Sequence, residues 1–222
     1  MKKGLVVVGI LSFLLAGCST TGSSAKETDP EVQEISVSLP AELTTLDTTQ
    51  TTDKVTFTVI QHLFEGSYRF DEKSQPVPGL AEEAVISEDG KTYTFKLKEE
   101  AKWSDGQQVQ AADFAYAWKK LVDPKTMGPN AYLLDNVVNS QDIREGKADI
   151  ATIGLETPDE KTFVVHLEQL QPSFLSVVSI GWLAPQRQSY VEEKGMAYGK
   201  TSEDLLYTGP FILKDWQQTG AE

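Results

Sequence analysis

The alternation of apolar and polar positions is clearest in the middle of the chain. Over residues 92–97, apolar side chains take every second position (Tyr93, Phe95 and Leu97), which predicts a half-buried strand. Asp89-Gly90 lies just before it, and an Asp-Gly pair between two apolar runs is typical of a tight hairpin turn. The pattern therefore predicts a hairpin whose first strand is 84–86.

A helical period follows this strand. Phe114, Trp118 and Leu121 recur at i, i+4 and i+7, which predicts an amphipathic helix with one apolar face. Asp123-Pro124 should end the helix, because proline disfavours helical geometry in the residue before it. Trp103 and Trp118 both occupy predicted buried positions, so we interpret them as core residues rather than stacking platforms for sugars or bases.

Similar patterns predict further elements on both sides of this block. Strands are expected at 35–39, 68–70, 153–155 and 162–167, and helices at 53–64, 172–178 and 186–194. Thr52 or Asp53 should cap the first of these helices, and Gly66 is predicted to end it. Strands and helices alternate along the chain, so the sequence predicts a mixed α/β protein.

The N-terminal segment has the layout of a secretory signal. Lys2 and Lys3 precede an apolar run over residues 5–15, which is too short to span a bilayer. Leu15-Ala16-Gly17 followed by Cys18 resembles a bacterial lipobox, which implies cleavage before Cys18 and a lipid on its sulfur. We therefore predict a lipoprotein signal peptide at 1–17 and a flexible, polar tether at 18–34.

Composition and charge narrow the class of partner. The chain has 222 residues, 40% of them hydrophobic and 24% charged, as in an ordinary soluble domain. Its net charge of −13 makes nucleic acid an unsuitable partner, because phosphate binding needs clustered Lys and Arg. Cys18 is the only cysteine, so one chain cannot form an internal disulfide.

The sequence offers no support for catalysis or metal binding. His62 and His166 are 104 positions apart, and no Cys/His cluster has the spacing of a zinc site. Asp105 stands beside Gly106 in a predicted turn, where a structural role fits better than that of a general base. We expect a protein that is not an enzyme and has neither cofactor nor metal.

Three motifs in the central block carry a family resemblance. Asp-Gly-Lys-Thr-Tyr-Thr-Phe-Lys-Leu (89–97), Lys-Trp-Ser-Asp-Gly (102–106) and Ala-Asp-Phe (112–114) occur in this order. Together they resemble the signature of the family 5 extracellular solute-binding proteins, the oligopeptide-binding lipoproteins of ABC importers. Segments 76–82, 139–147 and 205–216 are also similar to elements of that family, a helix at 139–147 and a strand at 205–216 among them. In the strand, Thr208 replaces the usual Asn.

The resemblance implies a fold and a division into lobes. The fold is α/β and periplasmic-binding-protein-like (type II, cluster C), with residues 35–54 as the first part of lobe I. Residues 55–179 would form a near-complete α/β lobe II, and 180–222 an incomplete continuation of lobe I. Members of the family are much longer, with a third domain and return strands that finish the first lobe. We therefore interpret the sequence as an N-terminal portion or a truncated product.

The resemblance also implies candidate ligand contacts. The segment 40–47, which includes Glu42, Leu43 and Thr44, is similar to one that lies at the binding cleft in the family. A solvated loop carboxylate is an equal interpretation of Glu42. The loop 125–134 corresponds to one that touches the ligand backbone in oligopeptide binders, which makes Asn130, Ala131 and Tyr132 candidates. Asn130 stands where those binders have an aromatic residue.

The function implied is that of a receptor for an importer. It would capture short peptides between two lobes and deliver them to membrane-embedded permease subunits, as a monomer when full length. It would be anchored through Cys18 on the extracytoplasmic face of a cell membrane of Gram-positive type, and this portion alone should bind poorly. Two alternatives stay open: a same-fold receptor for a signalling peptide, haem or a nickel complex, and a surface interaction lipoprotein for adhesion or chaperoning.

Overall fold

The computed structural model describes residues 34–216. Its contacts divide the chain into two units, Met1–Ser38 and Leu39–Glu222. The predicted strand at 35–39 is wrong, because none of the described segments pairs with it and a strand needs a hydrogen-bonded neighbour. Ile35 and Val37 are 65% and 72% exposed instead.

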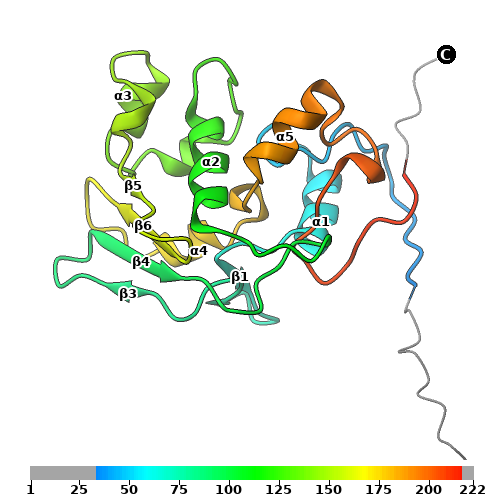
Figure 1. Ribbon diagram of the computed structural model, residues 1–222, viewed down its shortest axis with the longest axis horizontal. Coiled ribbons are helices and arrows are strands. Elements are labelled where there is room, and N and C mark those ends of the chain that lie inside the picture. The colour runs from blue at the N-terminus through cyan, green and yellow to red at the C-terminus, as the bar shows by residue number, and fades with distance from the viewer. Residues whose placement is uncertain (1–33, 217–222) are drawn as a thin grey trace, which may run out of the picture. The chain divides into compact units, whose positions relative to one another are not determined.

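Within residues 34–216, the helices and strands lie in the second unit (Figure 1). Its α-helices are α1 (Lys54–Leu63), α2 (Ala111–Val122), α3 (Ser140–Arg144), α4 (Phe174–Val178) and α5 (Gln188–Lys194). Its strands are β1 (Tyr68–Phe70), β2 (Pro76–Pro78), β3 (Val85–Ile86), β4 (Thr92–Lys96), β5 (Leu155–Glu156) and β6 (Thr162–His166). Short 3-10 helices lie at Ala131–Leu134, Ile150–Thr152, Gly181–Leu183, Gly195–Ala197 and Ser202–Asp204.

The strands form a four-stranded antiparallel sheet and a separate ribbon. The sheet has the order β3-β4-β6-β5, and β1 pairs with β2 in the ribbon. The hairpin predicted from Asp89-Gly90 is confirmed, with Gly90 at φ +68° between β3 and β4. The predicted pairing of the strand at 162–167 with its upstream neighbour is also confirmed, as β5 and β6.

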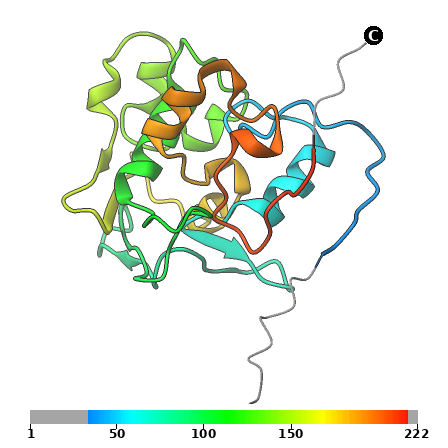
Figure 2. The ribbon, with the colours of Figure 1, turned by 45° about the vertical axis from the view of Figure 1, so that its right-hand side comes forward.

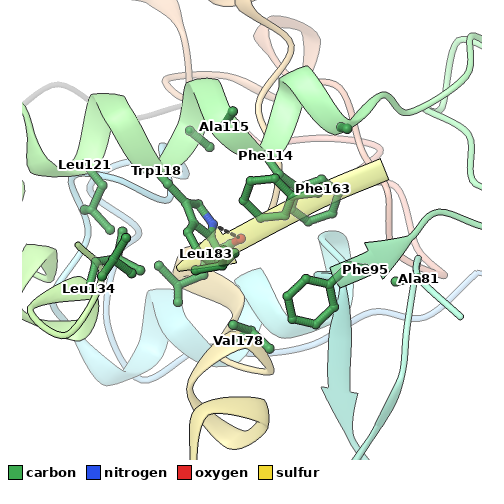
Figure 3. Close-up of a cluster of buried hydrophobic side chains, with 14 of the residues drawn as sticks. Ala81, Phe95, Phe114, Ala115, Trp118, Leu121, Leu134, Phe163, Val178 and Leu183 are labelled. Carbon is green, nitrogen blue, oxygen red and sulfur yellow. Dashed lines mark hydrogen bonds between the residues drawn. The ribbon is translucent and has the colours of Figure 1, made fainter. Parts of the chain in front are cut away.

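The main core lies between this sheet and the helices α2 and α4 (Figure 3). Phe163 of β6 is fully buried at its centre, with ring centroids 5.6 Å from Phe114, 5.0 Å from Trp118 and 6.3 Å from Phe95. The indole of Trp118 donates to the carbonyl oxygen of Leu183 at 3.0 Å, so its polar group is satisfied inside the core. The predicted core role of Trp118 is confirmed.

A second hydrophobic cluster collects residues from both ends of the described unit. It consists of Leu43, Leu46, Ile60, Leu63, Phe64, Ala184, Val191, Tyr198, Leu205 and Tyr207. The chain therefore leaves this cluster after α1, builds the main core, and returns to the cluster near residue 184. The division into lobes stays a prediction, and in the structure α1 packs in the second cluster.

Helix α1 begins as predicted and ends differently. Asp53 caps its N-terminus, accepting a hydrogen bond from the backbone N–H of Thr56 at 2.8 Å. The prediction that Gly66 ends the helix is wrong, because the helix ends at Leu63 and the next residue is extended. The carbonyl of Leu63 accepts instead from the backbone N–H of Gly209, 146 residues later.

The segment 205–216 runs beside the end of α1 (Figure 2). Its predicted strand is wrong, because its backbone bonds to a helix end rather than to a strand. The hydroxyl of Thr208 accepts from the N–H of Glu65 at 2.9 Å and donates to the carbonyl of Glu65 at 3.2 Å. A Cβ on Gly209 would lie 2.6 Å from the Leu63 carbonyl carbon, so only glycine permits this approach.

Candidate functional site

Two connecting segments of the second unit meet through side-chain hydrogen bonds. Residues 47–53 precede α1, and residues 126–132 follow α2. The side-chain amide of Asn130 donates to the carbonyl of Thr51 at 2.6 Å, and that of Gln50 donates to the carbonyl of Thr126 at 3.3 Å. We call this junction the Thr51–Asn130 seam.

The downstream half of the seam holds three of the candidate ligand contacts. Asn130 and Ala131 are each only 4% exposed, whereas Tyr132 is 54% exposed. The backbone N–H of Ala131 donates to Gly128, and the carbonyl of Asn130 accepts from Leu133. Of the three residues, the side chain that this loop presents to solvent is therefore that of Tyr132.

The other three candidates lie upstream of the seam. Glu42 and Thr44 are exposed, and Leu43 is 6% exposed in the second hydrophobic cluster. The residues that follow them dock on a turn at Gly199, whose carbonyl accepts from the N–H of Leu46 at 2.8 Å. The structure thus joins the loop 126–132 to residues 50 and 51 through the two side-chain hydrogen bonds of the seam. The ligand-contact roles of residues 42–44 stay predictions.

A buried polar network lies behind the upstream half of the seam. The ammonium of Lys120 on α2 lies 2.8 Å from Asp47 Oδ2 and donates to Gln186 Oε1 at 3.0 Å. The amide of Gln186 donates in turn to Asp47 Oδ1 and to the hydroxyl of Thr48. This network joins the segment before α1, helix α2 and the segment before α5, so it fixes the segment that forms the seam.

Loop geometry keeps the downstream half of the seam against α2. A Cβ on Gly128 would lie 2.4 Å from the carbonyl oxygen of Leu121, so the loop reaches the end of α2 only because residue 128 is glycine. Met127 has a left-handed backbone (φ +49°) and is 80% exposed. A residue other than glycine in this conformation is uncommon and is often found at functional sites.

A pocket of about 670 Å³ lies elsewhere in the unit, where α1 ends. Its lining includes His62, Glu65, Arg69 and Thr208. Burial raises the pKa of Glu65 although Arg69 and Lys98 oppose the shift, and Arg69 Nε lies 3.1 Å from its carboxylate. His62 Nδ1 donates to the carbonyl of Thr58 at 2.7 Å. Both side chains are thus held in structural contacts.

The predicted turn at Asp105 has a structural role. Its carboxylate accepts from the N–H of Gln107 at 3.0 Å and lies 2.7 Å from Arg187 Nη2. Partial burial would raise its pKa, but the hydrogen bonds and charge of Arg187 outweigh burial, and the pKa is lowered. In the same turn, the N–H of Ser104 donates to the carbonyl of Tyr207, and the hydroxyl of Ser104 accepts from the N–H of Tyr207. These bonds hold the segment around Tyr207 against the turn.

Neither a metal site nor a membrane span is found among residues 34–216. No group of three or more His, Cys, Asp or Glu there could hold a metal ion. In the same part of the chain, no helix combines the length and the apolar character needed to cross a bilayer. His166 bonds to Glu156 at 2.9 Å and Thr92 at 3.2 Å on the outer face of the sheet. The predicted lipidation residue, Cys18, lies outside the described residues.

Sequence reasoning missed the upstream half of the seam. Residues 48–52 read Thr-Thr-Gln-Thr-Thr, which is typical of a solvated loop. In the structure Thr48, Thr49 and Thr51 are at most 2% exposed. Local composition carries no signal for this burial, because the partners of Thr51 and Thr48 are 79 and 138 positions away.

Comparison with known proteins identifies the family. The profile of the bacterial extracellular solute-binding proteins, family 5 Middle, matches residues 75–221. A dipeptide-binding protein of Lactococcus lactis is 36% identical over 94% of this chain and 36% of its own length. The periplasmic oligopeptide-binding protein OppA of Salmonella typhimurium is 33% identical over 97% of this chain and 40% of its own length. The chain thus spans two fifths or less of these relatives.

Solved structures agree with the fold implied by the resemblance. OppA of Listeria monocytogenes bound to peptide gives a TM-score of 0.77 with 37% identity, over 79% of this chain and 35% of that one. The substrate-binding domain of an oligopeptide ABC transporter from Bacillus anthracis gives 0.76 with 40% identity, over 78% and 33%. The periplasmic-binding-protein-like α/β fold, covered in part, is therefore confirmed. The chain belongs to the bacterial extracellular solute-binding proteins of family 5.

Proposed function

We propose that the full-length protein carrying this chain is the substrate-binding protein of an ABC importer that captures oligopeptides. It would hold a short peptide in a cleft between two lobes, close by a hinge motion, and pass the peptide to the permease subunits. The chain described here contributes one wall of that cleft. No chemical step is required, and the relatives named above are binding proteins.

The observation that carries this proposal is the match to peptide receptors over nearly the whole chain. Relatives named as dipeptide- or oligopeptide-binding proteins align with more than nine tenths of it. Two of the solved structures that share its fold were determined with a bound peptide. Identity above 30% over this length supports a shared mode of ligand capture as well as a shared fold.

The geometry of the seam supports the same function. It brings two irregular segments together beside the start of α1, with Tyr132 exposed at one edge. Recognition of an extended peptide by backbone groups tolerates many ligand sequences, which suits an importer of mixed peptides. We propose the loop 126–132 and the segment before α1 as parts of the peptide wall, with 42–44 as a further part.

The test is calorimetric titration of the full-length gene product with di-, tri- and pentapeptides of varied sequence. Saturable binding of several unrelated peptides is the expected result. Binding to unfolded protein without binding to any defined peptide would overturn it and favour a chaperone-like lipoprotein. We expect the 222-residue chain alone to bind weakly or not at all, because two fifths of a receptor supplies only one side of a cleft.

We further propose that the mature protein is anchored by a lipid on Cys18, at the extracytoplasmic face of a Gram-positive type membrane. The lipobox-like sequence before Cys18 supports this. Labelling of cells with radioactive palmitate should mark the wild-type protein and not the Cys18→Ala variant. A labelled Cys18→Ala variant would show that the lipid is attached elsewhere. We expect the full-length receptor to be a monomer, which light scattering can check.

A receptor for one signalling peptide is the second candidate. The solved structure of the pheromone receptor PrgZ, described with its mode of peptide binding, matches with a TM-score of 0.77 and 35% identity. The same titrations separate the two functions. A receptor for nutrient uptake should bind many peptides with similar affinity. A signalling receptor should bind one peptide sequence with an affinity that is higher by orders of magnitude. Haem and nickel complexes belong in the same panel, and saturable binding of either would identify a same-fold receptor for that ligand.

A further inference from the structure

We infer that Asn130 is a positioning residue, which locks the loop 126–132 onto the segment before α1 and does not itself touch the ligand. The inference rests on the proposed peptide-binding function and gives Asn130 a different part in it. The family resemblance made this residue a ligand contact. In the structure, the side-chain amide nitrogen of Asn130 donates to the Thr51 carbonyl and the backbone carbonyl of Asn130 accepts from Leu133.

The side-chain amide nitrogen of Asn130 already has a hydrogen-bond partner. It is 4% exposed, and its Nδ2 lies 2.6 Å from the carbonyl oxygen of Thr51, which is itself 1% exposed. A hydrogen bond this short between two buried groups is costly to break, because each group would lose its partner without gaining water. A ligand acceptor that took over this hydrogen bond would displace the Thr51 carbonyl.

The backbone around Asn130 is occupied as well. Its carbonyl accepts from the N–H of Leu133, and the N–H of Ala131 donates to Gly128. These bonds close the turn that begins the 3-10 helix Ala131–Leu134. The turn and the side-chain bond together fix the position of Tyr132, so among the three candidate contacts Tyr132 is the side chain that can meet a ligand.

The Asn130 bond joins two segments that are far apart in the sequence. Thr51 and Asn130 are 79 positions apart, and the second side-chain bond of the seam, from Gln50 to Thr126, is longer at 3.3 Å and exposed. Residues 51–53 lead directly into α1, whose N-cap is Asp53. Loss of the Asn130 donor should therefore loosen the start of α1 and the loop at the same time.

The discriminating variant is Asn130→Asp in the full-length protein. A carboxylate keeps the acceptor that a peptide N–H could use and lacks the donor that the Thr51 carbonyl needs. Asn130→Ala is the second variant, because it removes both groups without adding a charge. Asn139→Asp is the matched control: Asn139 Nδ2 also donates to a backbone carbonyl, that of Thr152 at 2.8 Å, away from the seam.

Calorimetric titration with several peptides of different side chains is the first readout. We expect both Asn130 variants to lose about tenfold in affinity for every peptide, the factor that one net hydrogen bond of about 1.4 kcal/mol supplies. Asn139→Asp should stay within about twofold of the wild type. Tyr132→Ala should lose affinity by amounts that depend on the peptide. Unchanged binding by Asn130→Asp, or a loss that depends on peptide side chains, would overturn the inference.

Hydrogen exchange without ligand is the second readout, and it separates this inference from the proposed function. Amides in the peptide spanning residues 47–57 should exchange about tenfold faster in both Asn130 variants than in the wild type. In Asn139→Asp their exchange rates should equal those of the wild type. Unchanged exchange at 47–57 would overturn the positioning role even if peptides bind. A wild-type protein that binds no peptide would overturn the proposed function, and the exchange result would then stand by itself.

Discussion

The ammonium nitrogen of Lys120 lies 2.8 Å from Asp47 Oδ2, and the two side chains are only 18% and 11% exposed. The pair joins the middle of the chain to a residue 73 positions earlier, and Gln186 contacts both partners. The ring of Tyr198 lies 5.1 Å from the same ammonium. Four segments therefore converge on one partly buried charge pair behind the seam.

Removal of one member of this pair should lower the stability of the protein strongly. Lys120→Met leaves the carboxylate of Asp47 buried without its cation, so we expect the free energy of unfolding to fall by about 3–5 kcal/mol. Urea denaturation at pH 7 measures the change. Lys125→Met is the control, because Lys125 is exposed, and it should change stability by less than about 0.5 kcal/mol.

The double variant Lys120→Met with Asp47→Asn tests the reason for that loss. It removes both charges, so no ion is left buried alone, and it should be more stable than Lys120→Met. Equal stability of the single and double variants would show that packing of the lysine stem, rather than the unpaired carboxylate, accounts for the loss.

The hydroxyl of Thr208 should stabilise the end of α1 from outside the helix. Thr208→Val keeps the shape and removes both hydrogen bonds to the backbone of Glu65, so we expect a loss of about 1–3 kcal/mol in urea denaturation. Thr208→Ser should recover most of it. Thr94→Val, on the outward face of β4, is the control for exchange of a threonine hydroxyl for a methyl group. A Thr208→Val protein as stable as wild type would contradict the capping role.

Local periodicity was enough to predict the centre of the fold. The hairpin at Gly90, the helix that ends before Pro124 and the burial of Trp118 all follow from residues within a few positions of one another. The family motifs lie in the same block. Such features can be predicted from the sequence because turn residues, helix ends and side-chain alternation depend on the local backbone.

Features that depend on distant partners could not be predicted. The segment 35–39 alternates like a strand, but no described segment pairs with it. Gly66 looked like a helix terminator, whereas α1 ends on Gly209 through contacts that span 146 positions. The buried threonines of the seam read as a loop for the same reason. The resemblance predicted Asn130 as a candidate ligand contact. It could not predict the hydrogen bond between Asn130 and Thr51.

The aromatic cluster around Phe163 should dominate the stability of the main core. Phe163 is fully buried and packs against Phe95, Phe114 and Trp118, so Phe163→Ala should lower the free energy of unfolding by about 3–5 kcal/mol. Val164→Ala is the neighbouring control on the outer face of β6, with an expected loss below about 1 kcal/mol. A similar loss for both variants would mean that β6 pairing, rather than the aromatic cluster, limits stability.

Asp113 should give the chain an unusual dependence of stability on pH. It is 7% exposed, and burial raises its pKa above the ordinary 3.8 even though the N–H groups of Gln110 and Trp103 donate to it. Between pH 3.8 and the raised pKa, the folded state holds a proton that the unfolded state has lost. Stability from this group therefore falls as the pH rises through that window.

The variant Asp113→Asn isolates this effect, because an amide oxygen can still accept a hydrogen bond and does not titrate. The stability of wild type minus that of Asp113→Asn should decrease as the pH rises above 3.8 and then become constant. Asp89 supplies the opposite case, since the hydroxyl of Ser87 lowers its pKa. Wild type minus Asp89→Asn should decrease as the pH falls below 3.8. Urea denaturation across this pH range measures both differences, and parallel slopes for the two variants would show that burial does not govern Asp113.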